Sequence, residues 1–400
     1  MPAASTRARD LGIVIGAGEP GPLNAITDVA GVRVGHATLI RGEGPLVVGT
    51  GPVRTGVTVI LPHDGDVWSE PLFAGSDTLN GNGEMTGLEW IREAGLLYGV
   101  IGITNTNDVG TVRDALVRQA VRSRPEGALY WALPVAAETW DGRLNDIAGS
   151  HVRAEDVDAA IAAASGGAVD EGNVGGGTGM VCHEFKGGIG TASRRVPADL
   201  GGWTVGVLVQ ANYGRRGLLR IDGVPVGEAI PTSEVPSPVG DSALPPGSAP
   251  PPGSAPPPRP ASDASPGAGS IIGIIATDAP LLPQQCARLA RRASLGVART
   301  GGFGATTSGD IFVAFATGNR GMPAPDAPAL GDGAVPVRAL MDRALDPLFE
   351  ATVEATEEAI VNALVAADTM TGRDGVTAHR LPHDRLVEVM RAAGRLRGRP

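Results

Sequence analysis

Ser270 is the residue of this 400-residue chain whose position most strongly suggests nucleophilic chemistry. It begins the apolar run SIIGIIATD, directly after a proline-rich segment that ends at Gly269. A serine hydroxyl needs a neighbouring base in order to attack a carbonyl group, and a free α-amine with a pKa of about 7.7–8.0 can be that base near neutral pH. The amine of Ser270 is free only if the chain is cut, so the sequence predicts self-cleavage of the Gly269–Ser270 bond.

Gly269 suits such a cleavage. A residue without a Cβ lets the following hydroxyl approach its carbonyl carbon and tolerates a strained peptide. The alternative is that Ser270 only begins a strand after a linker, as many serines do. The residues alone leave both interpretations open.

Two other motifs look like ligand-binding sequences but lack the residues that binding would require. GNVGGGTGM, at residues 172–180, lacks the GK[ST] ending of a phosphate loop and is not the GxGxxG opening of a dinucleotide-binding helix. His379 and His383 are four residues apart, but Pro382 interrupts the helix that would align them, and no third ligand follows. We therefore expect no nucleotide, no metal and no other cofactor.

Composition narrows the class of protein. With 59 Gly and 33 Pro the chain is not a helical bundle, and with 4% aromatic residues its core must consist mainly of Val, Ile, Leu and Ala. A net charge of −10 argues against nucleic acid and membrane surfaces as partners. Two cysteines are too few for a disulfide framework, and no apolar run is long enough for a membrane span. We expect a soluble, cytoplasmic protein.

The elements that must position Ser270 alternate between strands and helices. Short Val- and Ile-rich runs between glycine-bearing turns predict buried strands at residues 56–61, 98–104, 130–137, 203–211, 270–278 and 310–317. Helical periodicity predicts helices at residues 109–121, 154–164 and 283–293, and a long helical stretch after Val335 that is broken at Pro347. This order fits sheets sandwiched by helices.

A proline-rich segment at residues 231–269 interrupts this order. It carries the unit PPGSAP twice in tandem and has almost nothing apolar to bury. Such a segment cannot offset the entropy cost of ordering, so we expect an exposed, partly polyproline-II tether. A tether that runs directly into a core strand is unusual for a linker between domains.

Six motifs occur in one order across nearly the whole chain: LNGNGEMTG (79–87), ETWDGRLND (138–146), EGNVGGGTGM (171–180), VGVLVQANYGRR (205–216), GAGSIIGIIATDAPLLP (267–283) and TSGDIFVAF (307–315). Together they resemble the self-cleaving L-aminopeptidase/D-amino-acid esterase-amidase family, whose relatives include the beta-peptidyl aminopeptidases. One such string would be weak evidence. The ordered set, with a dispensable segment just before Ser270, makes the resemblance specific.

The resemblance implies catalytic partners for Ser270. Ser308 and Asp310 would be the serine and carboxylate that assist it, and Asn212 would donate from its side chain to the oxyanion of the tetrahedral intermediate. Relatives can carry Glu in place of Asp310. The alternative from the residues alone is ordinary turn chemistry at Ser308 and Asp310 and a strand cap at Asn212.

The resemblance also implies a substrate pocket. Glu138 would hold the ammonium group of the substrate, and Trp140, where some relatives have Tyr, would line the pocket wall. Asn80, Asn82 and Glu84 would lie near the site without a step of their own. The alternative for Glu138 is a solvated residue at the end of a strand.

The fold that the resemblance implies is an α+β, four-layer αββα sandwich like that of N-terminal-nucleophile hydrolases. Residues 1–269 would form an alpha fragment and residues 270–400 a beta fragment that carries the nucleophile, both within one composite domain. The implied assembly is a homotetramer of cleaved pairs. The implied substrates are small peptides and amino-acid amides or esters.

Two rival functions remain at this stage. An ornithine-acetyltransferase-like enzyme is also self-processed and similar in architecture, but we expect a threonine nucleophile there, which Ser270 does not match. A non-catalytic binding protein could offer its proline-rich tether to domains that recognise polyproline-II segments. The tandem PPGSAP unit is weak evidence for it, because such tethers occur in many enzymes.

Overall fold

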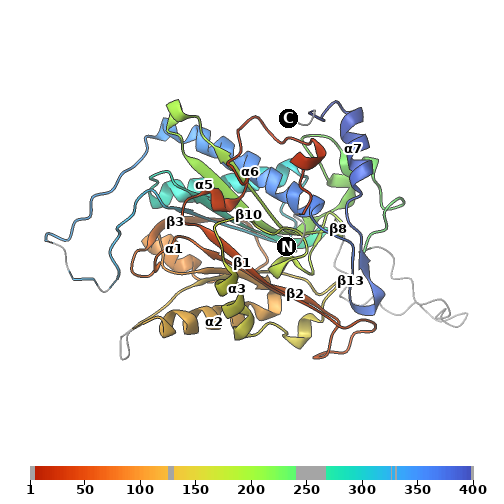
Figure 1. Cartoon of the computed structure of the whole chain (residues 1–400), viewed down its shortest axis with the longest axis horizontal. Helices are drawn as coiled ribbons and strands as arrows, with labels where there is room; N and C mark the ends of the chain where they lie inside the picture. The colour runs from red at the N-terminus through yellow and green to blue at the C-terminus, as the bar shows by residue number, and fades with distance from the viewer. Residues whose placement is uncertain (1–4, 125–129, 240–266, 326, 329–330, 398–400) are drawn as a thin grey trace, which may run out of the picture.

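The computed structural model of the single chain describes residues 5–124, 130–239, 267–325, 327–328 and 331–397. Figure 1 shows two stacked sheets with helices on both outer faces. The four-stranded sheet has the order β1-β2-β5-β6, with β1 (Arg33–Arg41), β2 (Val53–Leu61), β5 (Ile101–Asn105) and β6 (Val135–Thr139). Its β5 and β6 run parallel to each other.

The second sheet has six strands in the order β4-β3-β12-β11-β10-β9. Their bounds are β4 (Leu96–Leu97), β3 (Leu72–Gly81), β12 (Gly309–Ala316), β11 (Gly267–Thr277), β10 (Thr204–Gly214) and β9 (Gly188–Arg195). β11 and β12 are parallel, whereas the other pairs of this sheet are antiparallel. β11 therefore lies inside the sheet, with a partner on each side.

Helices cover the outer face of each sheet. α5 (Pro283–Arg299) and α6 (Asp346–Val365) pack on the six-stranded sheet, while α2 (Val109–Arg122) and α3 (Ala154–Ala163) pack on the four-stranded sheet (Figure 1). The predicted αββα sandwich is confirmed. Smaller elements complete the chain: α1 (Leu88–Ala94), α4 (Val226–Ala229), α7 (His383–Ala392), the hairpin of β7 (Val181–Cys182) with β8 (Phe185–Lys186), and that of β13 (Met370–Thr371) with β14 (Thr377–Ala378).

Alternation along β11 shows how the sandwich is filled. Ile272 and Ile274 belong to the apolar layer between the two sheets, whereas Ile271 and Ile275 belong to the layer under α5 and α6. Successive side chains of a strand point to opposite faces, so a strand covered on both faces must be apolar at nearly every position. The sequence run SIIGIIATD meets that requirement.

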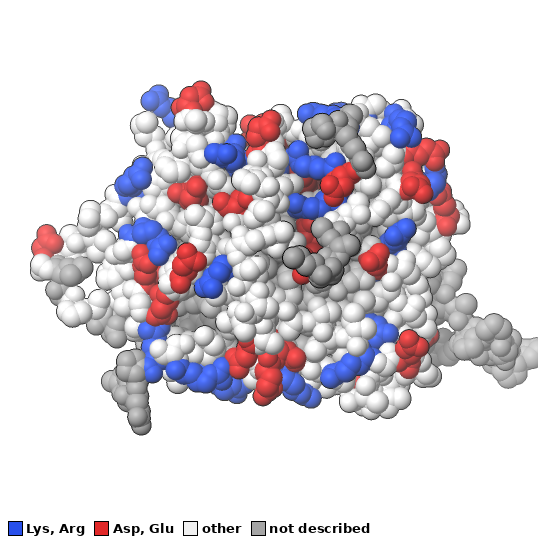
Figure 2. Space-filling view, viewed as in Figure 1, with Lys and Arg blue, Asp and Glu red and all other residues white. Residues whose placement is uncertain are grey.

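Charged side chains of both signs are interspersed on the face seen in Figure 2. Arg122 of α2, for example, pairs with Asp158 of α3 at 2.6 Å. Within its described residues, this face has no large area of basic side chains alone.

The first part of the proline-rich segment is partly buried. Val235 is buried, and its carbonyl oxygen accepts a hydrogen bond from the guanidinium of buried Arg216 at 3.0 Å. A buried guanidinium needs such acceptors, so the expectation of an exposed tether does not hold for Val235 and Pro238, whereas residues 232–234 and 236 are exposed. Residues 240–266 lie outside the described residues, and residues 267–269 already belong to β11.

Pro347 begins a helix rather than breaking one. It stands in the first turn of α6, where a residue without an N–H group loses no helical hydrogen bond. The residues between Val335 and Met341 are not helical, so the predicted helix before Pro347 is wrong.

Glycines in the strands let the helices pack closely. A Cβ on Gly190 of β9 would lie 1.9 Å from the carbonyl oxygen of Ala359 in α6, and a Cβ on Gly75 of β3 would lie 2.2 Å from the nitrogen of Ala287 in α5. These neighbours are backbone atoms and cannot turn away. Close contact between strand and helix accounts for part of the high glycine content.

Gly190→Ala is expected to lower the free energy of unfolding by at least about 2 kcal/mol, because α6 must move away from β9. Urea unfolding followed by circular dichroism measures this change. Gly110→Ala on α2 is the matched control, since its Cβ would meet no atom within 4 Å and should stabilise the helix by up to about 1 kcal/mol. Equal stability of the two variants would contradict the packing argument.

Candidate active site

Strand register places Ser270 between the predicted site residue Asn212 and the glycine that separates Ser308 from Asp310. Ser270 is opposite Asn212 of antiparallel β10 and opposite Gly309 of parallel β12. It shares its face of β11 with Ile272 and Ile274, so its side chain points toward the space between the sheets. The residue is only 5% exposed. The structure thus puts Ser270 at the edge where the layer between the two sheets ends.

Ser308 and Asp310 form a hydrogen-bonded pair. The Ser308 hydroxyl donates to Asp310 Oδ1 at 2.5 Å, and both residues are buried. Burial raises the pKa of the Asp310 carboxyl to about 6, although hydrogen bonds from Ser308 and from the Ile271 amide lower it. A carboxylate with this pKa can accept a proton close to neutral pH.

Ser270 contacts this pair through the residue between them. The backbone N–H of Gly309 donates to Ser270 Oγ at 3.1 Å. Among the described residues, no hydrogen bond joins Ser270 directly to Ser308 or Asp310. Ser308 and Asp310 are therefore paired with each other and linked to Ser270 through the Gly309 amide, and their role as a proton relay stays a prediction.

Asn212 is fixed at both ends of its amide. Its Nδ2 donates to the carbonyl oxygen of Trp140 at 2.9 Å, and its Oδ1 accepts from the N–H of Val181 at 2.8 Å. Nδ2 carries two hydrogens, of which the bond to Trp140 uses one. The amide is thus held beside Ser270 with donor capacity remaining.

Glu138, near the end of β6, brings the four-stranded sheet to the site. It is 3% exposed; its Oε1 accepts from the N–H of Glu84 at 2.9 Å, and its Oε2 accepts from the Thr106 hydroxyl. A Cβ on Gly83 would lie 3.0 Å from Glu138 Oε1 and 3.0 Å from the Cα of Gly309. A single glycine therefore separates the Glu138 carboxylate from the Ser308–Asp310 turn.

The Glu138 carboxylate is buried without an opposite charge. Burial raises its pKa, whereas the hydrogen bonds from Thr106 and from the Glu84 amide lower it. Among the described residues it makes no ion pair. A buried carboxylate in this state gains stability from an incoming cation, so a solvated strand-end residue is not the right description of Glu138.

Trp140 is connected to the site mainly through its backbone. Its carbonyl oxygen holds Asn212, whereas its side chain is 38% exposed and lies 5.9 Å from the Arg143 guanidinium. The role of the indole as a pocket wall stays a prediction.

Several supporting residues were missed or left without a role in the sequence analysis. Thr106 was given no role, yet its hydroxyl donates to Glu138. Asn80 donates to the Thr306 and Ser308 carbonyl oxygens, and Asn82 donates to that of Thr307. The run of Asn residues in LNGNGEMTG was the available signal, since asparagine amides readily bind neighbouring backbone.

Lys186 is a further supporting residue that the sequence did not reveal. It is fully buried, and its Nζ donates to the carbonyl oxygens of Gly177, Met180 and Gly187 at 3.3, 2.9 and 2.7 Å. Burial lowers its pKa to about 7. Lys186 thereby fixes the glycine-rich turn that leads into Val181, whose N–H holds Asn212. Lysine is normally a surface residue, so nothing in the sequence pointed to it.

The family model described as Peptidase family S58 matches residues 24–378. The chain belongs to peptidase family S58. Among S58 relatives, beta-peptidyl aminopeptidase BapA of Sphingosinicella microcystinivorans is 49% identical over 394 residues, which cover 98% of this chain and 94% of BapA.

Two solved structures extend the S58 comparison. A Burkholderia sp. beta-aminopeptidase has a TM-score of 0.85 and 51% identity, covering 99% of this chain and 100% of its own. The second is the L-aminopeptidase D-Ala-esterase/amidase of Ochrobactrum anthropi, with a TM-score of 0.82 and 42% identity, covering 98% of this chain and 99% of its own. It is described as a prototype for the serine aminopeptidases with a new variant of the Ntn hydrolase fold.

S58 membership confirms the family resemblance, and the Ochrobactrum neighbour confirms the fold type. The chain is a hydrolase of the aminopeptidase class, which favours the peptidase prediction over both the acyltransferase and the binding protein. Within the described ranges, no helix has the length and apolar character to cross a bilayer. In the same ranges, no group of three or more His, Cys, Asp or Glu residues could hold a metal ion.

The pKa of Asp310 can be tested directly. Infrared difference spectra against pH should contain a carboxyl band that titrates near pH 6 and is absent in Asp310→Asn. Ser308→Ala should raise this pKa further, because it removes a donor that stabilises the carboxylate. Ser294→Ala on α5, whose hydroxyl has no partner among the described residues, is the control and should leave the band in place. A band that Ser308→Ala does not shift would contradict the pairing.

Proposed function

We propose that this S58 chain is a self-processing serine aminopeptidase that acts through an ester on Ser270. The observation that carries the proposal is the register that sets Ser270 between Asn212 and Gly309, with the unpaired Glu138 carboxylate across Gly83. A nucleophile, an amide donor and a buried anion thus converge at one edge of the sandwich.

In the maturation step, Ser270 Oγ attacks the carbonyl carbon of Gly269. The C–N bond to Ser270 breaks, the hydroxyl proton passes to the departing nitrogen, and an ester joins Gly269 to Ser270 Oγ. Water then hydrolyses the ester, leaving a carboxylate on Gly269 and a free α-amine on Ser270. A Cβ on residue 269 would lie 2.0 Å from the Asn212 carbonyl oxygen, so the close pairing with β10 requires glycine there. The products would be fragments 1–269 and 270–400.

In turnover, the free amine of Ser270 takes the hydroxyl proton as Oγ attacks the carbonyl carbon of the substrate's N-terminal residue. The same proton goes to the leaving amine or alcohol, and water hydrolyses the acyl-enzyme. Asn212 would donate to the oxyanion, and Ser308 with Asp310 would orient the amine and exchange protons with it. No further group is needed for the proton balance.

Glu138 would fix the substrate by its ammonium group. The proposed substrates are small peptides and amino-acid amides or esters with a free amine, in keeping with the names of the relatives, which include a beta-peptidyl aminopeptidase and an L-aminopeptidase D-Ala-esterase/amidase. Trp140 would border this pocket. Because it stands where some relatives have Tyr, the phenol O–H of that Tyr would be missing as a donor here. The homotetramer of cleaved pairs, implied by the resemblance, belongs to the same proposal.

Ser270→Ala should remain a single chain and should not hydrolyse aminoacyl nitroanilides, because both the attacking hydroxyl and the route to the free amine are lost. Intact mass of the denatured protein gives the first result, and absorbance of released nitroaniline gives the second. Active wild-type protein whose only N-terminus is Met1 or Pro2 would refute self-cleavage.

Glu138→Gln should separate maturation from turnover. Losing a charge-assisted contact to the substrate ammonium should cost on the order of 1.5–3 kcal/mol, which lowers kcat/KM by roughly tenfold to a hundredfold. Cleavage before Ser270 involves no ammonium and should proceed at a near-normal rate. Electrophoresis of the maturing protein and kcat/KM on a peptide amide with a free N-terminus measure the two effects.

Glu89→Gln is the matched control for this variant, since Glu89 is an exposed residue of α1 whose partner is Arg92. It should change neither reaction. If Glu138→Gln slows maturation and turnover equally in folded protein, Glu138 is a scaffold residue and the ammonium site lies elsewhere.

A further inference from the structure

Lys186 is the only lysine in the sequence, among 33 Lys and Arg residues in all. The chain therefore uses arginine at every other basic position. Lys186 is also fully buried, at the end of the short strand β8. Lysine is normally exposed, and burying a cation is costly. The placement of the one ammonium group in the interior therefore calls for a physical reason.

The surroundings of this ammonium group are neutral acceptors. An ammonium has three N–H donors, one more than a neutral amine, and Lys186 Nζ donates to three carbonyl oxygens. A compact ammonium suits acceptors that converge on one point, whereas the planar fork of an arginine does not. The three acceptors favour the charged form, in opposition to the burial that lowers the pKa of Lys186 to about 7.

Two ionisable groups face Lys186, the Cys182 thiol and the Asp141 carboxyl, and both are fully buried. Each raises the pKa of Lys186, but by less than burial lowers it. Burial also raises the pKa of Cys182 and of Asp141 itself. Neither group therefore supplies a full negative charge at pH 7, and the charge of Lys186 is not cancelled by a close counter-ion.

The Met180–Val181 peptide unit connects Lys186 to Asn212. Its carbonyl oxygen accepts from Lys186 Nζ at 2.9 Å, and its N–H donates to Asn212 Oδ1 at 2.8 Å. Hydrogen bonds in a chain polarise one another. A positive charge at the Met180 oxygen makes the Val181 N–H a stronger donor, and this in turn makes the Asn212 Nδ2–H groups stronger donors.

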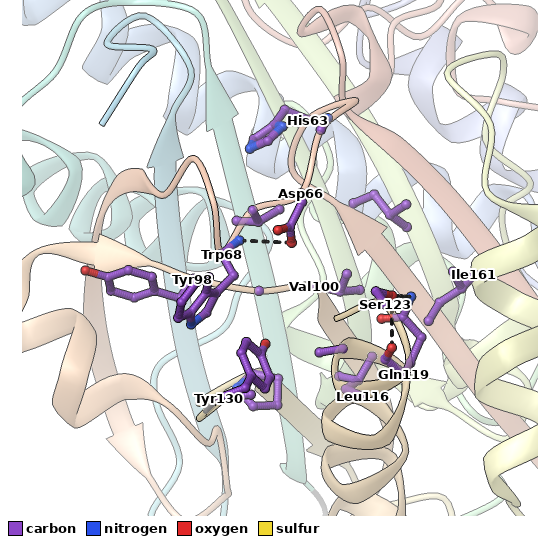
Figure 3. Close-up of a pocket in the computed structure, with 17 residues that line it drawn as sticks. His63, Asp66, Trp68, Tyr98, Val100, Leu116, Gln119, Ser123, Tyr130 and Ile161 are labelled. Atoms are coloured by element: carbon purple, nitrogen blue, oxygen red, sulfur yellow. Dashed lines mark hydrogen bonds between the residues drawn. The ribbon is translucent and has the colours of Figure 1, made fainter. Parts of the chain in front are cut away.

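Figure 3 shows a contrasting case at the cavity beside Val100, which precedes β5 and lies at the end of the strands opposite to Glu138. The backbone N–H of Trp68 donates to Asp66 at 3.3 Å, and Gln119 Nε2 donates to Ser123 at 3.4 Å. Each bond joins residues at most four positions apart. These bonds are local to the cavity, which makes Gln119 a suitable control position.

We propose that Lys186 is a positioning residue whose positive charge strengthens Asn212 as the oxyanion donor. This inference rests on the proposed function, in which Asn212 donates to the oxyanion. Negative charge appears on the substrate oxygen only in the tetrahedral state. A cation behind the donor therefore stabilises the transition state more than the bound substrate.

Because the chain has one lysine, its charge state can be followed directly by NMR. Wild-type protein labelled with ε-13C-lysine should give one lysine signal, and the change of its chemical shift with pH gives the pKa of Lys186. The probe is an α-aminoboronic acid with the side chain of a hydrolysed aminoacyl nitroanilide. It forms a tetrahedral boronate anion on Ser270 Oγ, whose proton passes to the α-amine. The amino alcohol with the same side chain is the match without this anion.

The boronic acid should raise the pKa of Lys186 by about 0.5–1, because a nearby anion favours the charged form, whereas the amino alcohol should change it by less than about 0.2. A lysine that only held the turn in place would titrate alike with both probes. This measurement uses the wild-type protein, so it does not depend on the folding of a variant.

Lys186→Met keeps the length of the side chain and removes its charge. It should lower kcat about fivefold to twentyfold, which is less than the roughly hundredfold to thousandfold loss on removal of an oxyanion donor itself. Affinity for the boronic acid should fall by a similar factor. KM and affinity for the amino alcohol should change less than about twofold. Gln119→Met is the matched control and should change none of these quantities.

The outcomes separate this inference from the proposed function. A boronic acid that does not inhibit wild-type protein would count against the ester on Ser270, and the role of Lys186 would fall with it. Inhibition without a change in the pKa of Lys186 would overturn the role of Lys186 alone. Equal weakening of the boronic acid and the amino alcohol in Lys186→Met would overturn it as well, since Lys186 would then only support the structure.

Discussion

The register of β11 inside the six-stranded sheet determines where Ser270 lies relative to Asn212 and to the Ser308–Asp310 pair. Pairing with β10 on one side and β12 on the other aligns Ser270 with Asn212 and Gly309. A slip of one residue would turn Ser270 toward α5 and α6 and exchange the two isoleucine sets between layers. Burial of both faces prevents this slip. Phe312 adds a further constraint, because its ring lies 2.7 Å from where a Cβ on Gly273 would be.

Around this strand, buried ionisable groups are compensated mostly by neutral donors and acceptors. Hydroxyl and amide groups hold Asp310 and Glu138, and three carbonyl oxygens hold Lys186. Such contacts fix orientation without neutralising charge, so burial still shifts the pKa of each group toward its neutral form. Among the described residues, no internal ion pair therefore neutralises Asp310, Glu138 or Lys186.

Local sequence was enough to predict the parts of the fold that are apolar on both faces. β10, β11 and β12 fall in that class. The helices α2, α3 and α5 were predicted from a different signal, the helical spacing of their apolar residues on one face. β9 was missed because its sequence GIGTASRR looks like a surface loop. Its Arg194 is nevertheless buried, and it pairs with Glu354 and Glu358 of α6. A partner 160 residues away in sequence leaves no local signal.

The same distinction applies to the site. Ser308 and Asp310 are two residues apart, so their pairing follows from one turn. Glu138 depends on Thr106 and on the Glu84 amide, which come from two other loops. The parallel pairing of β5 with β6 brings Thr106 to it, and the stacking of the two sheets brings Glu84. Residue types suggested the chemistry, whereas the supporting contacts required the three-dimensional arrangement.

The strand order of the six-stranded sheet has a consequence for a protein cut before Ser270. β11 and β12 would come from one fragment, and they stand between β3 and β10 of the other. Neither fragment could then leave without breaking hydrogen bonds along two strand boundaries and exposing the apolar layers on both faces. The cut enzyme would stay assembled, but its refolding would become a bimolecular event. Its apparent stability would then follow mass action and rise with protein concentration, as for an obligate complex of two different chains.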